Sequence, residues 1–441
     1  MHRLANVIVA GSESPLVDHV INALAENNFN ALAYESAEDV LVEAVAAQPD
    51  LVLIEEGPGF DGFALARKLR DGSFGTSLPV VMFTETGNRD TFFTKALEAG
   101  VDDAFFAPIE PSEVVHRLRP LLRVSTMRWE LQRRATLAES FGANGEVSEA
   151  TEAESEPRVL VLYGDEARAA AINDWLGGRA VVAVDSSFEA EDMVTEQIFD
   201  AVVAYAETQA ESVLGFCAQI RNNPRLFNLP VIVVSEDETL GSRQFAHQRG
   251  ATRVVAPANN AAELRYAVES LIHRQRLRWD LRNALEALRQ AALLDVKSGQ
   301  FSRPFFEAHL TMLLQVAETW QKHLTLVVFS VPSIIGIRER FGDDAANDLI
   351  RQIGSWIRGL SRVEDLVAAF SEDEFCVTLP DTPAEEAQAV MNRIAGIISY
   401  TDFAVAEVYQ PINVTVEVGL TGMQVFDDTE NLIARAREIV G

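Results

Sequence analysis

The sequence has few cysteines, since only two of its 441 residues are of this type. Cys217 and Cys376 are far apart and each lies in an apolar context, so they form neither a metal-ligand spacing nor a disulfide framework. No apolar run approaches the ~18 residues of a membrane span, and the N-terminus leads into a strand pattern without a signal-peptide hydrophobic region. The sequence therefore predicts a cytoplasmic protein without a membrane span.

Basic residues are also scarce, since 37 Lys and Arg stand against 66 Asp and Glu and the formal net charge is -29. A field of this sign repels nucleic-acid backbones and anionic membrane surfaces, and we expect neither as a partner. An anionic ligand would bind only where local arginines and backbone donors overcome the charge of the whole chain.

What the sequence does contain is a repeated alternation of short apolar runs and amphipathic segments. The first series of runs is NVIVAG, PDLVLIEE, LPVVMFTE and VDDAFFAP, and the second is PRVLVLYG, FDAVVAYAE, LPVIVVSED and TRVVAPAN. Strands and helices that alternate at this length indicate a parallel sheet with helices on both faces. We expect two doubly wound, flavodoxin-like α/β domains at residues 1–124 and 157–270.

The segments that follow these two domains differ from each other. Residues 125–156 begin as a helix and then lose all periodicity in NGEVSEATEAESEP, which is acidic and nearly free of large apolar groups, so we expect a flexible linker. Residues 271–290 keep helical periodicity and are expected to form a helical connector. Residues 291–441 mix helices with alternating strands, which predicts an α+β domain with an antiparallel sheet.

Both α/β domains resemble the receiver domains of response regulators over their full length. In that family a carboxylate pair holds Mg²⁺, an aspartate accepts the phosphoryl group, and a hydroxyl and a lysine complete the site. The corresponding positions hold Gly11, Ser12, Glu55, Thr84 and Ala107 in the first copy, and Tyr163, Gly164, Tyr205, Ser235 and Ala256 in the second. The resemblance implies degenerate domains in which Glu55 and Tyr205 occupy the phosphoacceptor positions. Glu55 either imitates a phosphorylated state or is a retired acceptor in a domain kept for packing and contacts.

The C-terminal region carries three motifs in order, DVKSGQFSRPFF, FGDDAANDLI and SEDEF. They resemble the DxLTGLxNRRxF, FGHxxGDxxL and GGDEF motifs of the GGDEF family of diguanylate cyclases, which condense two GTP molecules into cyclic di-GMP. The resemblance implies a nucleotidyl-cyclase-like α+β fold. The family continues through a longer terminal helix and a final strand, so we expect residues 291–441 to be a C-terminally shortened GGDEF domain.

Most residues that the GGDEF family uses for catalysis are replaced. Catalysis needs two carboxylates that hold metal ions at the triphosphate and the attacking hydroxyl. The resemblance assigns these positions to Ser330 and Asp373, so one carboxylate is lost and one is kept. The other degenerate positions are the guanine-reading Arg338 and Asn347, and the signature positions Ser371 and Glu372, where the family has glycines. We therefore expect no cyclase activity and no bound metal.

Arg362 and Asp365 form an RxxD motif that the five residues Leu366 to Phe370 separate from Ser371. This spacing resembles the inhibitory site at which the GGDEF family binds cyclic di-GMP, and Arg393 falls where the family carries a second arginine. A guanidinium can contact a phosphate through two hydrogen bonds and stack on a purine, and a carboxylate can accept the N–H donors of a guanine edge. The alternative is a solvated surface ion pair, because RxxD pairs also arise by chance.

The order receiver, receiver and GGDEF, with degenerate catalytic positions and a kept RxxD motif, resembles the PleD-type and PopA-like branch of the family. The resemblance implies a non-catalytic cyclic di-GMP effector that forms a homodimer and uses its receiver domains for dimerisation and partner contacts. It also implies recruitment to a cell pole and delivery of CtrA to the ClpXP protease through an RcdA-like adaptor. The alternatives are a weak diguanylate cyclase, a GTP-binding pseudoenzyme and a ligand-independent scaffold.

Overall fold

The computed structural model describes residues 3–72, 78–145, 156–175, 181–256, 261–405 and 408–440. Most of the acidic segment expected to be a flexible linker lies outside the described residues. The chain divides into two compact units. The first, called here the α/β unit, comprises Asn6–Ser125 and Thr151–Asp280, and the second, called the C-terminal unit, comprises Met1–Ala5, Thr126–Ala150 and Leu281–Gly441.

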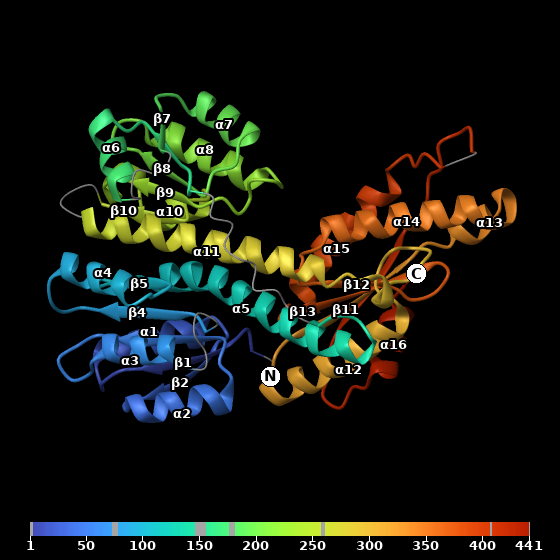
Figure 1. The fold of residues 1–441 in the computed structure, drawn as a ribbon, viewed down its shortest axis with the longest axis horizontal. Coiled ribbons are helices and arrows are strands. Elements are labelled where there is room, and N and C mark those ends of the chain that lie inside the picture. Colours follow the sequence, from blue (N-terminus) through green and yellow to red (C-terminus); the bar gives the residue numbers. More distant parts are fainter. Residues whose placement is uncertain are drawn as a thin grey trace. The chain divides into compact units, whose positions relative to one another are not determined.

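The first sheet of the α/β unit is parallel and has the strand order β2-β1-β3-β4-β5. Its strands are β1 (Asn6–Ala10), β2 (Asn30–Tyr34), β3 (Leu51–Glu55), β4 (Val80–Thr84) and β5 (Asp103–Phe106). Its helices are α1 (Pro15–Glu26), α2 (Ala37–Ala47), α3 (Gly62–Asp71), α4 (Arg89–Glu98) and α5 (Pro111–Ser140) (Figure 1). The strands β1, β3 and β4 are buried throughout, as expected for apolar strands with helices on both faces of the sheet. Four helices begin after a side chain that accepts a backbone N–H, at Ser14, Ser36, Asp61 and Asn88.

The second sheet repeats this topology, with the strand order β10-β9-β8-β6-β7 and parallel pairing throughout. Its strands are β6 (Val159–Leu162), β7 (Val181–Val184), β8 (Ala201–Tyr205), β9 (Val231–Val234) and β10 (Arg253–Val255). Its helices are α6 (Glu166–Trp175), α7 (Ser187–Glu196), α8 (Ala210–Asn222), α9 (Asp237–Leu240), α10 (Arg243–Gln248) and α11 (Ala261–Ala287). Numbered from the first strand of each domain, both sheets have the flavodoxin-like order 2-1-3-4-5.

The two sheet domains contact each other inside the α/β unit. Tyr266 on α11 is fully buried in the core of the first domain, where its hydroxyl donates to the carbonyl oxygen of Val101 at 2.9 Å. Asp103 on β5 accepts hydrogen bonds from Arg117 on α5 and from Arg253 on β10. Burial alone would raise the pKa of Asp103, but the two guanidinium groups outweigh it and hold that pKa well below its usual range. An aromatic anchor and a buried charge cluster therefore join the two domains.

The C-terminal unit contains a four-stranded antiparallel sheet with the order β12-β13-β11-β14. Its strands are β11 (Leu324–Ser330), β12 (Leu366–Ala369), β13 (Glu374–Pro380) and β14 (Glu417–Gly422). Its helices are η1 (Ala291–Leu293), α12 (Arg303–Trp320), α13 (Ser333–Phe341), α14 (Asp343–Leu360), α15 (Ala384–Ser399) and α16 (Thr429–Glu438), together with the second half of α5. The central strands β11 and β13 bring the predicted catalytic position Ser330 beside the signature hairpin, because Ser330 lies opposite Glu374 in their register.

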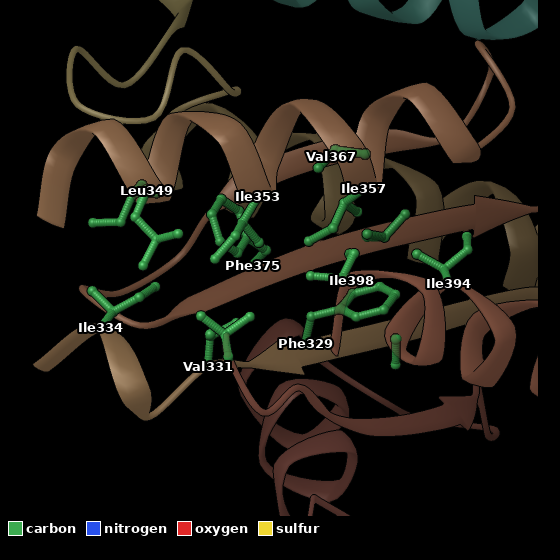
Figure 2. Packing of buried hydrophobic residues seen from close by; sticks show 14 of the residues in the cluster. Phe329, Val331, Ile334, Leu349, Ile353, Ile357, Val367, Phe375, Ile394 and Ile398 are labelled. Carbon is green, nitrogen blue, oxygen red and sulfur yellow. The ribbon is translucent and has the colours of Figure 1, made fainter. Parts of the chain in front are cut away.

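The sheet of the C-terminal unit has a hydrophobic core on each face. Figure 2 shows the core formed with α14 and α15, in which Phe329 and Phe375 from the sheet meet Leu349, Ile353 and Ile398 from the helices. The other core is formed with α12, α16 and the end of α5. The central strand β11 is buried throughout, and its successive residues belong to opposite cores, with Phe329 in the first and Val328 in the second. The one-sided apolar face of α14 covers the first core.

The predicted fold class is confirmed, since two parallel α/β sheets are followed by an antiparallel sheet with helices. The helices α5 and α11 continue past residues 124 and 270, where the sequence predicted the α/β domains to end. Their last segments, Thr126–Ser140 of α5 and Leu281–Ala287 of α11, belong to the C-terminal unit. None of the described helices is long and apolar enough to cross a membrane.

Candidate functional site

The Arg362–Asp365 segment forms a tight turn, called here the RxxD turn, between α14 and β12. Asp365 Oδ2 accepts a hydrogen bond from the backbone N–H of Arg362 at 2.8 Å, and the N–H of Asp365 donates to the carbonyl oxygen of Arg362 at 3.1 Å. Asp365 is only 7% exposed, whereas Arg362 is an exposed residue. The two residues therefore do different work: Asp365 fixes the backbone of the turn, and Arg362 presents its guanidinium at the surface.

A second loop, at the end of β13, lies beside the RxxD turn. Arg362 Nη1 donates to the hydroxyl of Thr382 at 3.5 Å, and this hydroxyl donates to the carbonyl oxygen of Pro380 at 2.9 Å. Asp381 in the same loop has an ordered partner for each oxygen, because Oδ1 lies 3.4 Å from Lys322 Nζ and Oδ2 accepts from the hydroxyl of Thr126 at 2.7 Å. Asp381, the acidic residue next to Thr382, is therefore bound by Lys322 and Thr126 rather than by Arg362.

Arg393, the third predicted ligand residue, lies on α15, the helix that begins just after this loop. It is exposed and forms no hydrogen bond or ion pair within the described part of the chain. Its position, nine residues beyond the start of α15, is ~14 Å along the helix axis from that start. The structure therefore brings Arg362 to the start of α15, but it records no contact between Arg393 and the RxxD turn.

The half of α5 that belongs to the C-terminal unit supplies contacts that the sequence did not reveal. Arg134 donates to the backbone carbonyl oxygens of Val363, at 3.3 Å, and of Glu364, the two middle residues of the RxxD turn. Thr126, on the same helix, holds Asp381 in the neighbouring loop. The only sequence signal was the basic, helical segment RWELQRRATLAESF, which does not indicate what the arginines contact.

The predicted catalytic position on β11, Ser330, is joined to the signature hairpin through the backbone. Ser330 is buried at the end of β11, and the N–H of the next residue, Val331, donates to the carbonyl oxygen of Asp373 at 2.8 Å. The hydroxyl of Ser371 donates to Asp373 Oδ1 at 3.0 Å and to Glu374 Oε2 at 2.9 Å. Among the described residues, no group of three His, Cys, Asp or Glu side chains could hold a metal ion. One carboxylate beside a serine is a poor substitute for the two carboxylates that the chemistry needs.

Two of the replaced residues bind each other. Arg338 on α13 lies 2.6 Å from Glu372 in the hairpin, measured from Nη1 to Oε2, and its Nε lies 3.4 Å from Asp343 Oδ1. Asn347 on α14 is half-buried, and its Oδ1 accepts no hydrogen bond from a described residue. The guanidinium at a predicted guanine-reading position is therefore already paired with the carboxylate at a predicted glycine position.

In the first α/β domain, Glu55 turns back onto the loop that follows β1. Its Oε2 accepts from the backbone N–H of Ser12 at 2.8 Å and from the Ser12 hydroxyl at 2.7 Å, and its Oε1 accepts from the Ser14 hydroxyl at 2.6 Å. Thr84, the predicted hydroxyl position, donates instead to the carbonyl oxygen of Glu56 at 2.7 Å. Three donors therefore bind the Glu55 carboxylate. They come from the sequence GSES, which shows that hydroxyl groups are present but does not show that they bind Glu55.

In the second α/β domain, an aromatic ring lies at the predicted phosphoacceptor position. Tyr205 is 7% exposed, and the guanidinium of Arg168 lies over its ring at 4.4 Å from the centroid. Arg168 also donates to Glu207 at 2.9 Å. Burial raises the pKa of the Tyr205 hydroxyl, with Arg168 acting in the opposite direction. This edge has packing and cation–π contacts in place of a carboxylate cluster.

Comparisons with known proteins agree with this organisation. Residues 292–440 match the family described as Diguanylate cyclase, GGDEF domain, and residues 7–119 match the Response regulator receiver domain. Response regulator PleD of Caulobacter vibrioides is 27% identical over 399 residues, which are 90% of this chain and 87% of PleD. Diguanylate cyclase DgcP of Pseudomonas aeruginosa is 24% identical over 251 residues, which are 54% of this chain and 36% of DgcP.

Among solved structures, the GGDEF domain of DgcB from Caulobacter crescentus, in complex with c-di-GMP, is 18% identical and has a TM-score of 0.32. The match covers 34% of this chain and 88% of that domain. The family matches agree with the fold, in which two parallel sheets are followed by an antiparallel sheet. In sequence and in the order of its parts, the chain is PleD-like, with receiver, receiver and GGDEF folds in succession.

Proposed function

We propose that this chain is a non-catalytic effector that binds cyclic di-GMP at the RxxD turn, through Arg362 and Asp365 and with Arg393 as a second cationic contact. One observation carries the proposal: Arg362 is exposed on a turn of fixed backbone and forms no ion pair with any described carboxylate. In a chain of net charge -29, such a guanidinium is a local exception that an anionic ligand requires.

The chemistry of these groups suits a cyclic dinucleotide. The planar guanidinium of Arg362 can bind a phosphate through two parallel hydrogen bonds or stack on a guanine. A carboxylate accepts several hydrogen bonds at once, so the bond from Asp365 to its own turn is compatible with contacts to the N–H groups of a guanine edge. The exposed Arg393 can reach a second face of a ligand that extends along α15.

The same residues argue against cyclisation. Ser330 offers no carboxylate to a metal ion, and Asp373 alone cannot hold the ions that bridge a triphosphate and an attacking hydroxyl. Glu372 adds a negative charge at the signature hairpin and is paired with Arg338. We therefore expect the site around Ser330 to be inactive, and we expect no metal ion to be required for cyclic di-GMP binding.

The rival function is that of a weak diguanylate cyclase or GTP-binding pseudoenzyme, which the kept Asp373 and the GGDEF family match favour. Incubation of the full chain with Mg²⁺ and GTP separates the two. We expect no cyclic di-GMP in the product mixture. Steady formation of cyclic di-GMP that the Asp373→Ala variant abolishes would establish the rival and overturn the proposed function.

Calorimetric titration of cyclic di-GMP into the full chain tests the binding directly. We expect micromolar or tighter affinity in the wild type and a loss of at least ~100-fold in the Arg362→Ala variant, since an interaction with a charged phosphate is removed. Arg351 on α14 is the matched control, because it is 58% exposed and pairs only with its own helix neighbour Asp348. Arg351→Ala should bind as the wild type does. Absence of heat in the wild type would support a ligand-independent scaffold instead.

The cellular part of the proposal concerns protein partners. By its resemblance to PopA-like proteins, the effector acts as a homodimer at a cell pole and helps deliver CtrA to ClpXP through an RcdA-like adaptor. Purified adaptor should bind the wild-type chain more tightly in the presence of cyclic di-GMP, and this gain should vanish in Arg362→Ala. An adaptor affinity that ignores the ligand would contradict this part and leave ligand binding intact.

A further inference from the structure

The C-terminal unit contains a buried charged cluster whose residues belong neither to the RxxD motif nor to the predicted catalytic positions. Glu130 and Arg134 lie on α5 and are 0% and 3% exposed at their side chains, and His309 on α12 is 0% exposed. Glu130 accepts from Arg134 Nε at 3.2 Å, from Arg133 Nη1 at 3.1 Å and from His309 Nε2 at 2.9 Å. Buried charges of this kind are costly unless they are fully partnered, so their arrangement is a specific feature of the fold.

The free end of Arg134 is directed at the RxxD turn. Its Nη1 and Nη2 donate to the carbonyl oxygens of Val363 and Glu364, while its Nε is held by Glu130. Buried backbone carbonyls need a donor, and the turn obtains both from one side chain of a helix that lies far away in the sequence. The guanidinium is a planar fork, so it fixes the two carbonyls relative to each other and relative to α5.

The charges of the cluster are consistent with this role. Burial alone would raise the pKa of Glu130, but His309 and the two arginines outweigh it and hold that pKa below its usual range. Burial lowers the pKa of His309, which favours the neutral imidazole as a donor to Glu130. Glu130 is therefore an ionised anchor for Arg134 at neutral pH.

A second contact from α5 reaches the other side of Arg362. Thr126 and Arg134 are eight residues apart on the helix, which is ~12 Å along its axis. Thr126 binds Asp381, and the next residue, Thr382, accepts the hydrogen bond from Arg362. One straight segment of α5 thus contacts both loops that surround the predicted ligand residue.

We propose that residues 126–140 of α5 are part of the cyclic di-GMP site, with Arg134 as the positioning residue that sets the RxxD turn. Ligand occupancy and the docking of this helix segment are then coupled, and each stabilises the other. This inference rests on the proposed function and adds its regulation, because α5 begins at Pro111 in the α/β unit and its residues from Thr126 onward belong to the C-terminal unit. If Arg134 had only a structural role, it would hold the turn in the same way with and without the ligand.

The test uses the full chain and three substitutions on α5. Arg134→Met removes the fork and keeps much of the side-chain length, Arg134→Lys restores a charge with single donors, and Arg119→Met is the control, because Arg119 is exposed on the same helix before residue 126. We expect cyclic di-GMP affinity to fall at least ~10-fold in Arg134→Met, to recover in part in Arg134→Lys, and to stay within about twofold in Arg119→Met.

Amide hydrogen exchange separates the two roles, because a purely structural role of Arg134 predicts no ligand-dependent change of exchange rate in residues 126–140. In the wild type, cyclic di-GMP should slow exchange in residues 126–140 as well as in the RxxD turn, and in Arg134→Met the slowing in 126–140 should disappear. A fourth substitution on α5, Thr126→Val, is used if Arg134→Met does not fold. It exchanges the hydroxyl that binds Asp381 for a methyl group and should weaken the ligand-dependent slowing. Wild-type affinity in folded Arg134→Met, or ligand saturation without any slowing in 126–140, overturns the inference. If Arg362→Ala still abolishes binding in that case, the proposed function stands alone.

Discussion

The RxxD turn and the signature hairpin flank the same short strand, β12, and they treat their charged side chains in opposite ways. The turn uses its carboxylate, Asp365, to fix its own backbone and has its carbonyls bound by Arg134. Its guanidinium therefore stays exposed. The hairpin carries an added carboxylate, Glu372, and this is bound by the added guanidinium of Arg338.

The contrast shows that the number of charged groups says little about binding capacity. An anion that approaches Arg338 must compete with a carboxylate that is already 2.6 Å away. An anion that approaches Arg362 meets a cation whose only described side-chain hydrogen bond is a long one to a neutral hydroxyl. The support for the turn comes from α5, which is distant in the sequence, and the side chain of Arg362 remains exposed.

The largest effect is expected from a substitution that removes the support of the RxxD turn. Glu130→Ala should lower the free energy of unfolding of the C-terminal unit by about 3–5 kcal/mol, because it leaves buried guanidinium groups without their counter-charge. Urea unfolding of the full chain measures this change. Glu372→Ala is the comparison in the hairpin, where the carboxylate is exposed, and it should cost less than about 1 kcal/mol. Equal effects of the two substitutions would contradict the contrast.

Acid should erase most of that difference. The folded-state pKa of Glu130 lies below its usual value of 4.5, so its contribution to stability is complete above that value and is lost as the pH falls further. The gap in unfolding free energy between the wild type and Glu130→Gln should therefore shrink as the pH falls below about pH 4.5. Between pH 7 and pH 5 the gap also reflects His309, because Glu130 raises the pKa of this buried imidazole against the effect of burial. A gap that kept growing below about pH 4.5 would show that Glu130 is neutral in the folded protein.

A conservative change sharpens the description of Arg362 as a fork rather than a point charge. Arg362→Lys should weaken cyclic di-GMP binding ~10-fold, since lysine keeps the charge and loses the paired donors. Isothermal titration at two salt concentrations checks this, and the salt dependence should resemble that of the wild type because the net charge is unchanged. Full affinity in Arg362→Lys would indicate general electrostatic attraction only.

The smallest effect concerns the hairpin. Glu372→Gln releases Arg338 from its partner and removes one exposed negative charge, so GTP binding should improve by only a few-fold, which corresponds to about 1 kcal/mol or less. Fluorescence titration with a labelled GTP analogue measures the change, and Glu386→Gln on α15 is an exposed control. Cyclic di-GMP formation should remain absent, because Ser330 is unchanged. A gain equal to that of the control would mean that the ion pair does not restrict the site.

Sequence patterns predicted the fold well because the information that defines it is local. The apolar runs and the amphipathic segments between them predict the strands and helices of each α/β domain, and the alternating strands of the C-terminal unit predict its antiparallel sheet. The residue positions of the RxxD motif and of the degenerate catalytic site could be named from motif spacing, and their ligand chemistry stays a prediction.

The contacts that give these residues their surroundings were beyond the reach of local pattern. Arg134 and Glu364 are 230 residues apart, and Glu55 is 43 residues from Ser12. Nothing in a single sequence pairs such positions, since side-chain partners are set by how the elements pack. The sequence predicted that residues 125–156 begin as a helix and continue as a flexible linker, but it did not indicate that Arg134 in this helix binds the RxxD turn.

The glycine that follows β1 affects which residues the positions around Glu55 can accept. A Cβ at Gly11 would lie 2.7 Å from the Cβ of Glu55 and 2.9 Å from its Oε2, so a side chain at position 11 requires a shift at position 55. Replacing Glu55 would leave the hydroxyls of Ser12 and Ser14 without this acceptor. Gly11, Ser12, Ser14 and Glu55 therefore form one set, in which a substitution at one position changes what the others can contact.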